Sequence, residues 1–245
     1  KGITLTPEGN TLYSHVSIAM KQLEDGENAI IKSKSLSGGT ICIGVSEIAL
    51  RIFLLKKLEK FTELFPDVKI KLTNHSTNQA VNALKAGLVD FAVVTTPVAL
   101  KKPLQRIPLY SFREILIGGE EYAETASNKH CLQDLQDIPL IGIAPGSSTR
   151  ELYTQYFMRH NLPFSPDMEV ATTDQIFPMV QHNLGIGFFP EELAAEHIAQ
   201  GKIVQIPIEE PLPERKICLI RNVKRPQSIA ARSLEEHLTS HRETE

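Results

Sequence analysis

Short apolar segments of strand length alternate with longer amphipathic segments in the first half of the chain. Residues 40–45, 68–72 and 91–94 are rich in Ile, Val and Leu, as is typical of buried strands. Residues 46–65 and 77–87 lie between them and carry apolar side chains at intervals of three and four, which indicates helices. Strands separated by helices at this spacing predict a mainly parallel sheet covered on both faces, the α/β class.

The same alternation starts again later in the chain. Strands are predicted at 139–143, 169–171, 185–189, 203–208 and 215–221, with helices at 148–161, 173–182 and 190–199 and a last helix opened by Pro226. We therefore predict two α/β lobes. Residues 37–117 with 215–245 are expected to form lobe I, and residues 118–214 lobe II. The crossings between the lobes are expected near residues 113–118 and 216–221.

A seam of apolar residues runs along the first predicted helix, residues 6–33. Thr6 is suited to cap this helix and Pro7 to its first turn. The seam residues recur at alternating spacings of four and three, the pattern of a coiled coil. They are Leu12, Val16, Ala19, Leu23 and Ile30, with Gly26 at the intervening position. We expect this helix to pair with a second copy; the alternative is a helix packed on its own domain.

Composition narrows the class of function. The chain has 26 Lys and Arg against 29 Asp and Glu, without the basic surplus that an autonomous DNA-binding domain usually carries. No run approaches the roughly 18 apolar residues of a membrane span, and the N-terminus has no signal-peptide pattern. Cys42, Cys131 and Cys218 lie far apart, and Cys42 and Cys218 are expected to be buried free thiols. We expect a cytoplasmic fragment of a longer protein, with no membrane contact.

Several motifs resemble those of LysR-type transcriptional regulators, in the same order along the chain. They are KGITLTPEG at residues 1–9, similar to the turn between the wing and the linker helix; ICIG at 41–44, similar to the first sensor strand; the segment from Phe61 to FPDV at 65–68; LKAGLVD at 84–90; and GIGFFP at 185–190. Each piece alone is weak, but the ordered set spans the whole chain and is specific. Two residues depart from the pattern: Leu55 stands where many members have proline, and Glu47 where small or hydroxyl residues are commoner.

The resemblance implies a two-lobed, periplasmic-binding-protein-like fold with mixed, mostly parallel sheets, preceded by a long linker helix. Residues 1–36 would hold the end of the wing and the dimerising linker helix, and the DNA-reading helix-turn-helix would lie outside this chain. A small-molecule effector would bind in the cleft between the lobes. Operator DNA would be bound through the missing domain. The sensor domains would pair side by side, with a tetramer for the full protein.

Five loops are candidates to bind the ligand. In an open α/β sheet, ligands lie beyond the carboxyl ends of the strands, where helix N-termini point. Free backbone N–H groups and the helix dipole favour an anion there, and Ser and Thr hydroxyls add donors. The candidate residues are Ser46, Glu47 and Ile48; Ser76 and Thr77, in a loop that ends at Asn78; Thr95, Thr96 and Pro97; Ser147, Ser148 and Thr149; and Phe189 with Pro190, which would supply an apolar wall.

Each of these hydroxyls could instead only cap its helix. We predict a cap at Ser148, which forms a capping-box pattern with Glu151 and leaves Ser147 for the ligand. Glu47 could select a cationic or amino group. The effector is therefore expected to be a small organic acid or an amino acid.

The sequence offers little support for catalysis. The GSS motif at 146–148 lacks the spacing of a nucleophile elbow, and GIG at 185–187 follows a helix, the wrong order for a dinucleotide fingerprint. The eight histidines form no metal-binding pair, and His75 alone lies beside a candidate loop. We expect no enzyme activity, no cofactor and no metal. The alternatives are a solute-binding protein that serves transport and, with less support, an enzyme on the same fold.

Overall fold

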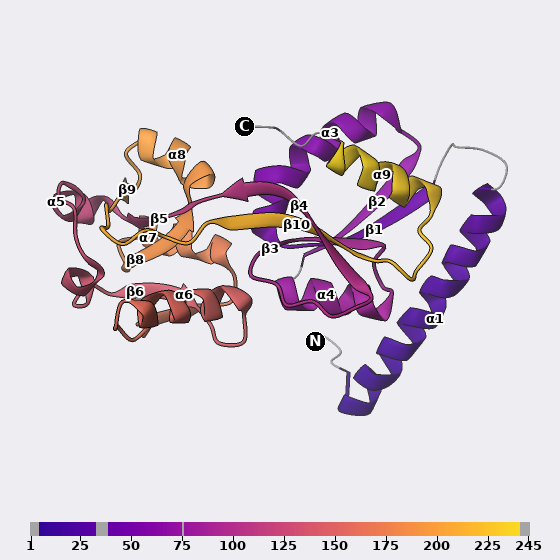
Figure 1. The fold of residues 1–245 in the computed structure, drawn as a ribbon, viewed down its shortest axis with the longest axis horizontal. Coiled ribbons are helices and arrows are strands. Elements are labelled where there is room, and N and C mark those ends of the chain that lie inside the picture. The colour runs from indigo at the N-terminus through magenta and orange to yellow at the C-terminus, as the bar shows by residue number, and fades with distance from the viewer. Residues whose placement is uncertain (1–4, 33–38, 75, 241–245) are drawn as a thin grey trace.

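The computed structural model describes residues 5–32, 39–74 and 76–240. Within these residues the chain forms two mixed five-stranded sheets, each covered by helices, and two extended segments pass from one lobe to the other (Figure 1). Helix α1 (Pro7–Lys32) lies beside lobe I, on the side away from lobe II (Figure 1). The two-lobed α/β fold with a long leading helix, expected from the sequence, is confirmed.

Lobe I is built on the sheet with strand order β2-β1-β3-β10-β4. Strand β1 pairs in parallel with β2 and β3, whereas β10 runs antiparallel to β3 and β4, because it returns from lobe II. The strands are β1 (Gly39–Val45), β2 (Val68–Asn74), β3 (Phe91–Thr95), β4 (Leu104–Phe112) and β10 (Arg215–Asn222). The helices are α2 (Glu47–Ala49), a π-helical turn at Leu50–Leu54, α3 (Leu55–Leu64), α4 (Thr77–Ala86) and α9 (Ile229–Thr239).

Lobe II repeats this plan with strand order β7-β6-β8-β5-β9. Strand β6 pairs in parallel with β7 and β8, and β5 runs antiparallel to β8 and β9. The strands are β5 (Glu114–Gly118), β6 (Leu140–Ile143), β7 (Met168–Val170), β8 (Ile186–Pro190) and β9 (Val204–Gln205). The helices are α5 (Ala123–Ala126), α6 (Ser148–Arg159), α7 (Ile176–Gln181) and α8 (Glu191–Ala199), with 3-10 turns at Glu120–Tyr122, Leu132–Leu135 and Thr173–Gln175.

The passage from lobe I to lobe II falls at Arg113, between β4 and β5. The predicted boundary after residue 117 differs from this by one strand, because β5 pairs with β8 and β9 in the sheet of lobe II. Apolar periodicity shows that a segment is a buried strand, but it does not show which of two sheets the strand joins. The return crossing leads into β10, as expected.

Strand β4 is the main element that the sequence did not predict. It is a half-exposed edge strand whose alternation is interrupted by Pro108, and its pairing with β10 shifts register between Ile217 and Cys218. Proline has no N–H to give to a ladder, so it occurs in strands mainly at edges and bulges. Pro108 therefore obscures the strand pattern in the sequence, but it is compatible with the edge position of β4.

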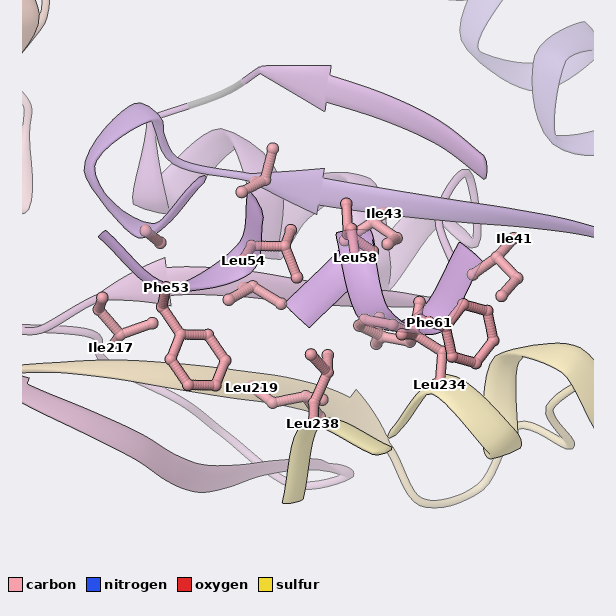
Figure 2. Packing of buried hydrophobic residues seen from close by; sticks show 14 of the residues in the cluster. Ile41, Ile43, Phe53, Leu54, Leu58, Phe61, Ile217, Leu219, Leu234 and Leu238 are labelled. Carbon is pink, nitrogen blue, oxygen red and sulfur yellow. The ribbon is translucent and has the colours of Figure 1, made fainter. Parts of the chain in front are cut away.

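The core of lobe I fixes the C-terminal helix on the sheet. Phe61 of α3 is fully buried, and its ring lies 4.8 Å from Phe65 and 5.7 Å from His237, measured between centroids. Leu234 and Leu238 of α9 point into the same cluster, between α3 and the strands (Figure 2). Helices α3 and α9 thus form one layer over the sheet, and α4 covers the opposite face (Figure 1).

Helix α1 contacts lobe I through one cluster of charged side chains. Thr6 caps the helix as predicted, since its Oγ1 accepts the N–H of Gly9 at 3.0 Å. Lys21 Nζ lies 3.1 Å from a carboxylate oxygen of Asp25, 3.4 Å from Cys42 Sγ and 4.0 Å from Asp90. Burial raises the pKa of Asp90, against the opposing effects of the Cys42 N–H and of Lys21. The helix is therefore attached to lobe I by polar contacts.

The predicted seam of α1 lies in solvent. Leu12 and Leu23 are each 64% exposed and Val16 is 47% exposed, while the side chain of Ile30 is outside the part of the chain that the structure describes. The seam therefore has no partner within this chain among the described residues.

Of the helices that are described, none is long and apolar enough to cross a membrane.

Candidate functional site

The Ser46 hydroxyl is buried and lacks a hydrogen-bond partner among the residues that the structure describes. Ser46 follows β1 and precedes α2, and it is only 8% exposed. Its backbone is satisfied, since its N–H donates to Val93 O at 3.1 Å and its carbonyl accepts from Leu50 N at 2.9 Å. The residue stands at the N-cap position, but its side chain makes no capping bond. A buried hydroxyl without a partner costs about 1–3 kcal/mol, so this oxygen calls for a further group beside it.

The two residues that follow Ser46 have separate roles. The Glu47 carboxylate, in the first turn of α2, accepts a hydrogen bond from Asn74 Nδ2 at 3.0 Å. Ile48 is buried in the core of lobe I, so its side chain packs against the sheet. Of the predicted trio, Ser46 and Glu47 present polar groups at this loop, and the side chain of Ile48 is committed to the core.

The loop before α4 is held by its own hydrogen bonds. Ser76 and Gln79 form a capping box, in which the Ser76 hydroxyl accepts from Gln79 N at 3.4 Å. Thr77 is buried and donates its hydroxyl to Thr95 O at 3.2 Å. Both hydroxyls therefore serve the local structure of lobe I. His75 lies outside the described residues.

The loop after β3 is joined to the start of β10. Thr96 Oγ1 accepts the N–H of Lys216 at 2.8 Å, and Thr96 N–H donates to Lys216 O at the same distance. Thr95 is buried, and its hydroxyl accepts from the guanidinium group of Arg215 at 3.0 Å. Pro97, half-buried, follows on a cis peptide bond. This loop thus meets the connection that returns from lobe II.

The predicted cap of α6 is wrong by one residue. The N-cap is Ser147, whose hydroxyl accepts from Arg150 N at 3.0 Å. Ser148 has turned into the first turn of the helix, where it is buried and donates to Asn78 Oδ1 of lobe I at 3.1 Å. Capping needs extended backbone angles, which Ser147 has (φ −95°, ψ 148°). The sequence pattern fitted either serine.

Asn78 joins the two lobes. Its Oδ1 accepts from Ser148, and its Nδ2 donates to the carbonyl of Gly146 at 3.3 Å, so one side chain of α4 makes two hydrogen bonds to the segment at the start of α6.

The fifth candidate loop, Phe189 and Pro190, does not place its aromatic ring at the interface between the lobes. Phe189 is 1% exposed and packs in the core of lobe II, 5.9 Å from the ring of Phe177, while Pro190 pairs with Glu114 in the sheet.

A buried charged network lies where the chain crosses between the lobes. Arg215, the first residue of β10, and Glu114, the first of β5, form an ion pair at 2.6 Å, and both side chains are 2% exposed. The guanidinium group also donates to Thr149 Oγ1 at 3.1 Å and to Thr96 O at 2.8 Å. The Tyr153 hydroxyl of α6 donates to the other oxygen of Glu114. The network connects both crossings, lobe I and α6, and it satisfies the buried charges that form it.

Arg215, Glu114 and Tyr153 were not among the predicted site residues, whereas Asn78 was predicted only as the end of a candidate loop. A signal for the ion pair is present in the sequence, since an apolar run follows one charged residue in EILIG at 114–118 and two charged residues in RKICLI at 215–220. Charged residues are rarely buried unless they are paired. The partners are about one hundred positions apart, and no local pattern joins them. Tyr153 carries no comparable signal.

Tyr153 gives the network a dependence on alkaline pH. Burial and the neighbouring charge of Glu114 raise the pKa of its hydroxyl well above the ordinary value near 10. In the unfolded chain this group ionises near pH 10, whereas in the folded chain it stays protonated. The folded state then holds the extra proton, so its stability is complete below about pH 10 and falls as the pH rises above that value.

We expect the free energy of unfolding of the wild type to fall more steeply than that of Tyr153→Phe above about pH 10. The difference should approach about 1.4 kcal/mol per pH unit, the linkage value for one proton. Urea unfolding from pH 8 to 11.5 measures it. Tyr13, exposed on α1, supplies the matched control: Tyr13→Phe should follow the wild-type curve. Equal slopes for the wild type and Tyr153→Phe would contradict this prediction.

Two α/β lobes are joined by two crossings, and loops with hydroxyl groups follow strands in both lobes. The sequence profile of the LysR substrate binding domain matches residues 34–243. The chain belongs to this family.

The relatives agree with this assignment, and the structural neighbours share the fold. The chain is 26% identical over 239 residues to a "Probable RuBisCO transcriptional regulator" of Nostoc sp., covering 96% of this chain and 71% of that protein. The effector binding domain of QuiR in complex with shikimate has a TM-score of 0.73 at 19% identity, over 83% of this chain and 97% of that one. The regulatory domain of CcmR from Synechocystis in complex with 2-PG has a TM-score of 0.72 at 17% identity, over 82% and 96%.

Proposed function

We propose that this chain is the sensor of a LysR-type transcriptional regulator and that it binds a small organic acid or amino acid between its lobes. The observation that carries the proposal is the buried, unpartnered hydroxyl of Ser46 at the carboxyl end of β1. Two of the structural neighbours are described as complexes with the small molecules shikimate and 2-PG, and the curated relatives are transcriptional regulators. The proposal includes no catalytic role.

The chemistry around Ser46 favours a ligand with an acidic group. Ser46 stands at the start of a helical segment that runs without a break through α2, the π-helical turn and α3. Free N–H groups and the positive end of the helix dipole favour negative charge at this point. Glu47 beside it carries a negative charge and is held by Asn74. A ligand with both a carboxylate and an amino group would satisfy both neighbours, so amino acids are the first class to examine.

The experiment begins with a thermal-shift screen of amino acids, small carboxylates and aromatic acids. For a compound that binds, Ser46→Ala should weaken affinity by roughly ten- to a hundredfold, because a hydrogen bond to a charged group is worth about 1.5–3 kcal/mol. The melting temperature should not fall, since the hydroxyl makes no bond to any residue in the described part of the chain. Titration calorimetry on the wild type and the variant gives the comparison.

Ser147→Ala is the matched control. The Ser147 hydroxyl caps α6, so its removal should lower stability by about 1 kcal/mol. The sequence suggested Ser147 as the residue whose substitution would test ligand binding without affecting stability. Because Ser147 caps α6, Ser46 is the better residue for this test. Unchanged affinity in Ser46→Ala would place the ligand elsewhere and overturn this site.

The remaining partners follow from the same proposal. Operator DNA is bound through a helix-turn-helix domain that would precede α1, and this locates the protein in the bacterial cytoplasm. The exposed seam of α1 pairs with the seam of a second copy, and side-by-side pairing of the sensor lobes gives a tetramer of the whole regulator. Support comes from the apolar stripe of Leu12, Val16 and Leu23, which is unusual on the surface of a monomer. The effector acts by favouring one arrangement of lobes and linker helices.

A further inference from the structure

Lobe II contains an apolar cavity apart from the loops between the lobes. It has a volume of about 170 Å³ and lies between the 3-10 turn Leu132–Leu135, α6 and the sheet. Its walls are aliphatic and aromatic: Leu132 and Leu135 from the turn, Phe157 from α6, and Leu116, Ile186 and Phe188 from the strands. The cavity opens to solvent along one edge, so a small molecule can enter it.

The size and walls of the cavity suit one six-membered ring. Cavities of roughly 150 Å³ lined by Leu, Ile and Phe bind benzene. Here the rings of Phe157 and Phe188 meet edge to face, with centroids 6.1 Å apart and planes at 83°. A ligand ring between such walls finds both a ring face and ring edges, the two geometries that aromatic pairs prefer.

The edge of the cavity is polar and carries one negative charge. Gln136, Ser165 and Asp167 line it there, and all three are exposed to solvent. Asp167 is held in place because its Oδ2 accepts the N–H of Leu140 at 2.8 Å and its own N–H donates to Leu140 O at 2.9 Å. A carboxylate accepts hydrogen bonds and repels anions. The polar edge therefore favours a ligand that donates a hydrogen bond and disfavours a carboxylate.

We propose that this cavity is a second ligand site, for a small neutral aromatic molecule with a hydroxyl group, such as a simple phenol. The ring lies against Phe157 and Phe188, and the hydroxyl donates to the polar groups at the edge. This class of ligand differs from the acidic effector proposed for the loops between the lobes, and the inference does not depend on that proposal.

The cavity borders the network between the lobes through Phe188. The opposite neighbour of the Phe188 ring is Tyr153, stacked on it with centroids 4.4 Å apart and planes at 17°. The Tyr153 hydroxyl donates to Glu114, the partner of Arg215. A ligand that packs on Phe188 thus contacts a ring that supports the crossing between the lobes. A ligand at the second site is therefore connected, through Phe188 and Tyr153, to the crossing between the lobes.

The test uses 4-fluorophenol, observed by fluorine NMR and by calorimetry. Saturable binding is expected with a dissociation constant at or below about 1 mM, within reach of a ligand of eight non-hydrogen atoms. Because of Asp167, 4-fluorobenzoate, with the same ring and an anionic group, should bind at least tenfold more weakly. Leu135→Phe fills the cavity and should weaken 4-fluorophenol binding at least tenfold without lowering the melting temperature. Ile138→Phe repeats this test from another wall should the first variant fail to fold.

Two controls separate this site from other surfaces. Leu184→Phe adds the same bulk at an exposed position of lobe II, and Ser46→Ala alters the loop between the lobes. Both should bind 4-fluorophenol like the wild type. Absence of saturable binding, equal binding of the benzoate, or wild-type affinity in the filled variants would each overturn the second site. Loss of binding in Ser46→Ala with retention in Leu135→Phe would place the phenol between the lobes and overturn it as well.

Discussion

Glu114→Ala is expected to lower the free energy of unfolding by about 3–5 kcal/mol, the loss typical when one partner of a buried ion pair is removed. Arg215 would be left with a positive charge at 2% exposure and without its carboxylate. Its remaining partners, including Thr95 Oγ1 and Thr96 O, are neutral and do not balance the charge. The Tyr153 hydroxyl would also lose its acceptor. Urea denaturation at pH 7 measures the loss.

Two further variants test whether the burial of the ion pair causes this loss of stability. Glu169→Ala breaks the ion pair between Arg150 and Glu169, which has the same 2.6 Å length but a carboxylate that is 41% exposed, and it should cost less than about 1 kcal/mol. The double variant Arg215→Met with Glu114→Leu removes both charges and should recover much of the stability lost in Glu114→Ala. Equal losses in Glu114→Ala and Glu169→Ala would contradict the importance of the buried network.

Leu23→Glu is expected to shift self-association of the chain by at least about a hundredfold. In a pair of α1 helices, each copy would lose the burial of one leucine, worth about 1.5–3 kcal/mol, and the two losses add in the dimer. Leu23 lies at the middle of the seam and is 64% exposed in the single chain. Sedimentation velocity at micromolar concentration should show a smaller assembly for the variant than for the wild type, because pairing through the sensor lobes alone remains.

Ser14→Glu is the control for charge on the same helix. Ser14 precedes Lys21 by seven residues, two helical turns, so it lies on the face that Lys21 turns toward lobe I. It is exposed and away from the seam. This variant should associate like the wild type. A wild-type chain that sediments as a monomer, with no change in Leu23→Glu, would refute pairing through α1.

The sequence predicted well whatever depends on local periodicity. The repeated strand and helix pattern gave both lobes, and Thr6 was identified as the cap of α1 because capping involves residues three positions apart. At α6, two neighbouring serines fitted the same rule. Their roles were separated by Asn78, seventy positions away in the chain, which binds Ser148 and leaves Ser147 as the cap.

The central part of the site depends on contacts that no local pattern contains. Arg215 and Glu114 meet only because the two crossings between the lobes run side by side, where Arg215 pairs with Phe112 at the end of β4. Phe189 and Ile48 were predicted at the ligand because they lie at or just beyond the carboxyl ends of strands, but the periodicity of their strand and helix turns both side chains into the cores. The Ser46 hydroxyl was predicted as a candidate, yet its lack of a partner became visible only in three dimensions.

Because α1 is attached to lobe I at only part of its length, its N-terminal part moves with lobe I as a rigid arm. Lys21 contacts Asp90, and Asp25 lies 3.5 Å from Arg225, so the helix is held near these two residues, and the part that leads back to Pro7 extends away from the contact. That free part has about 14 residues and, at 1.5 Å per residue, a length of about 21 Å. If lobe I rotates by roughly 10°, the N-terminal end of a segment of this length moves by about 4 Å. In the proposed regulator, a small change of angle between the lobes would therefore arrive at the DNA-reading end as a shift comparable to the spacing of one base pair.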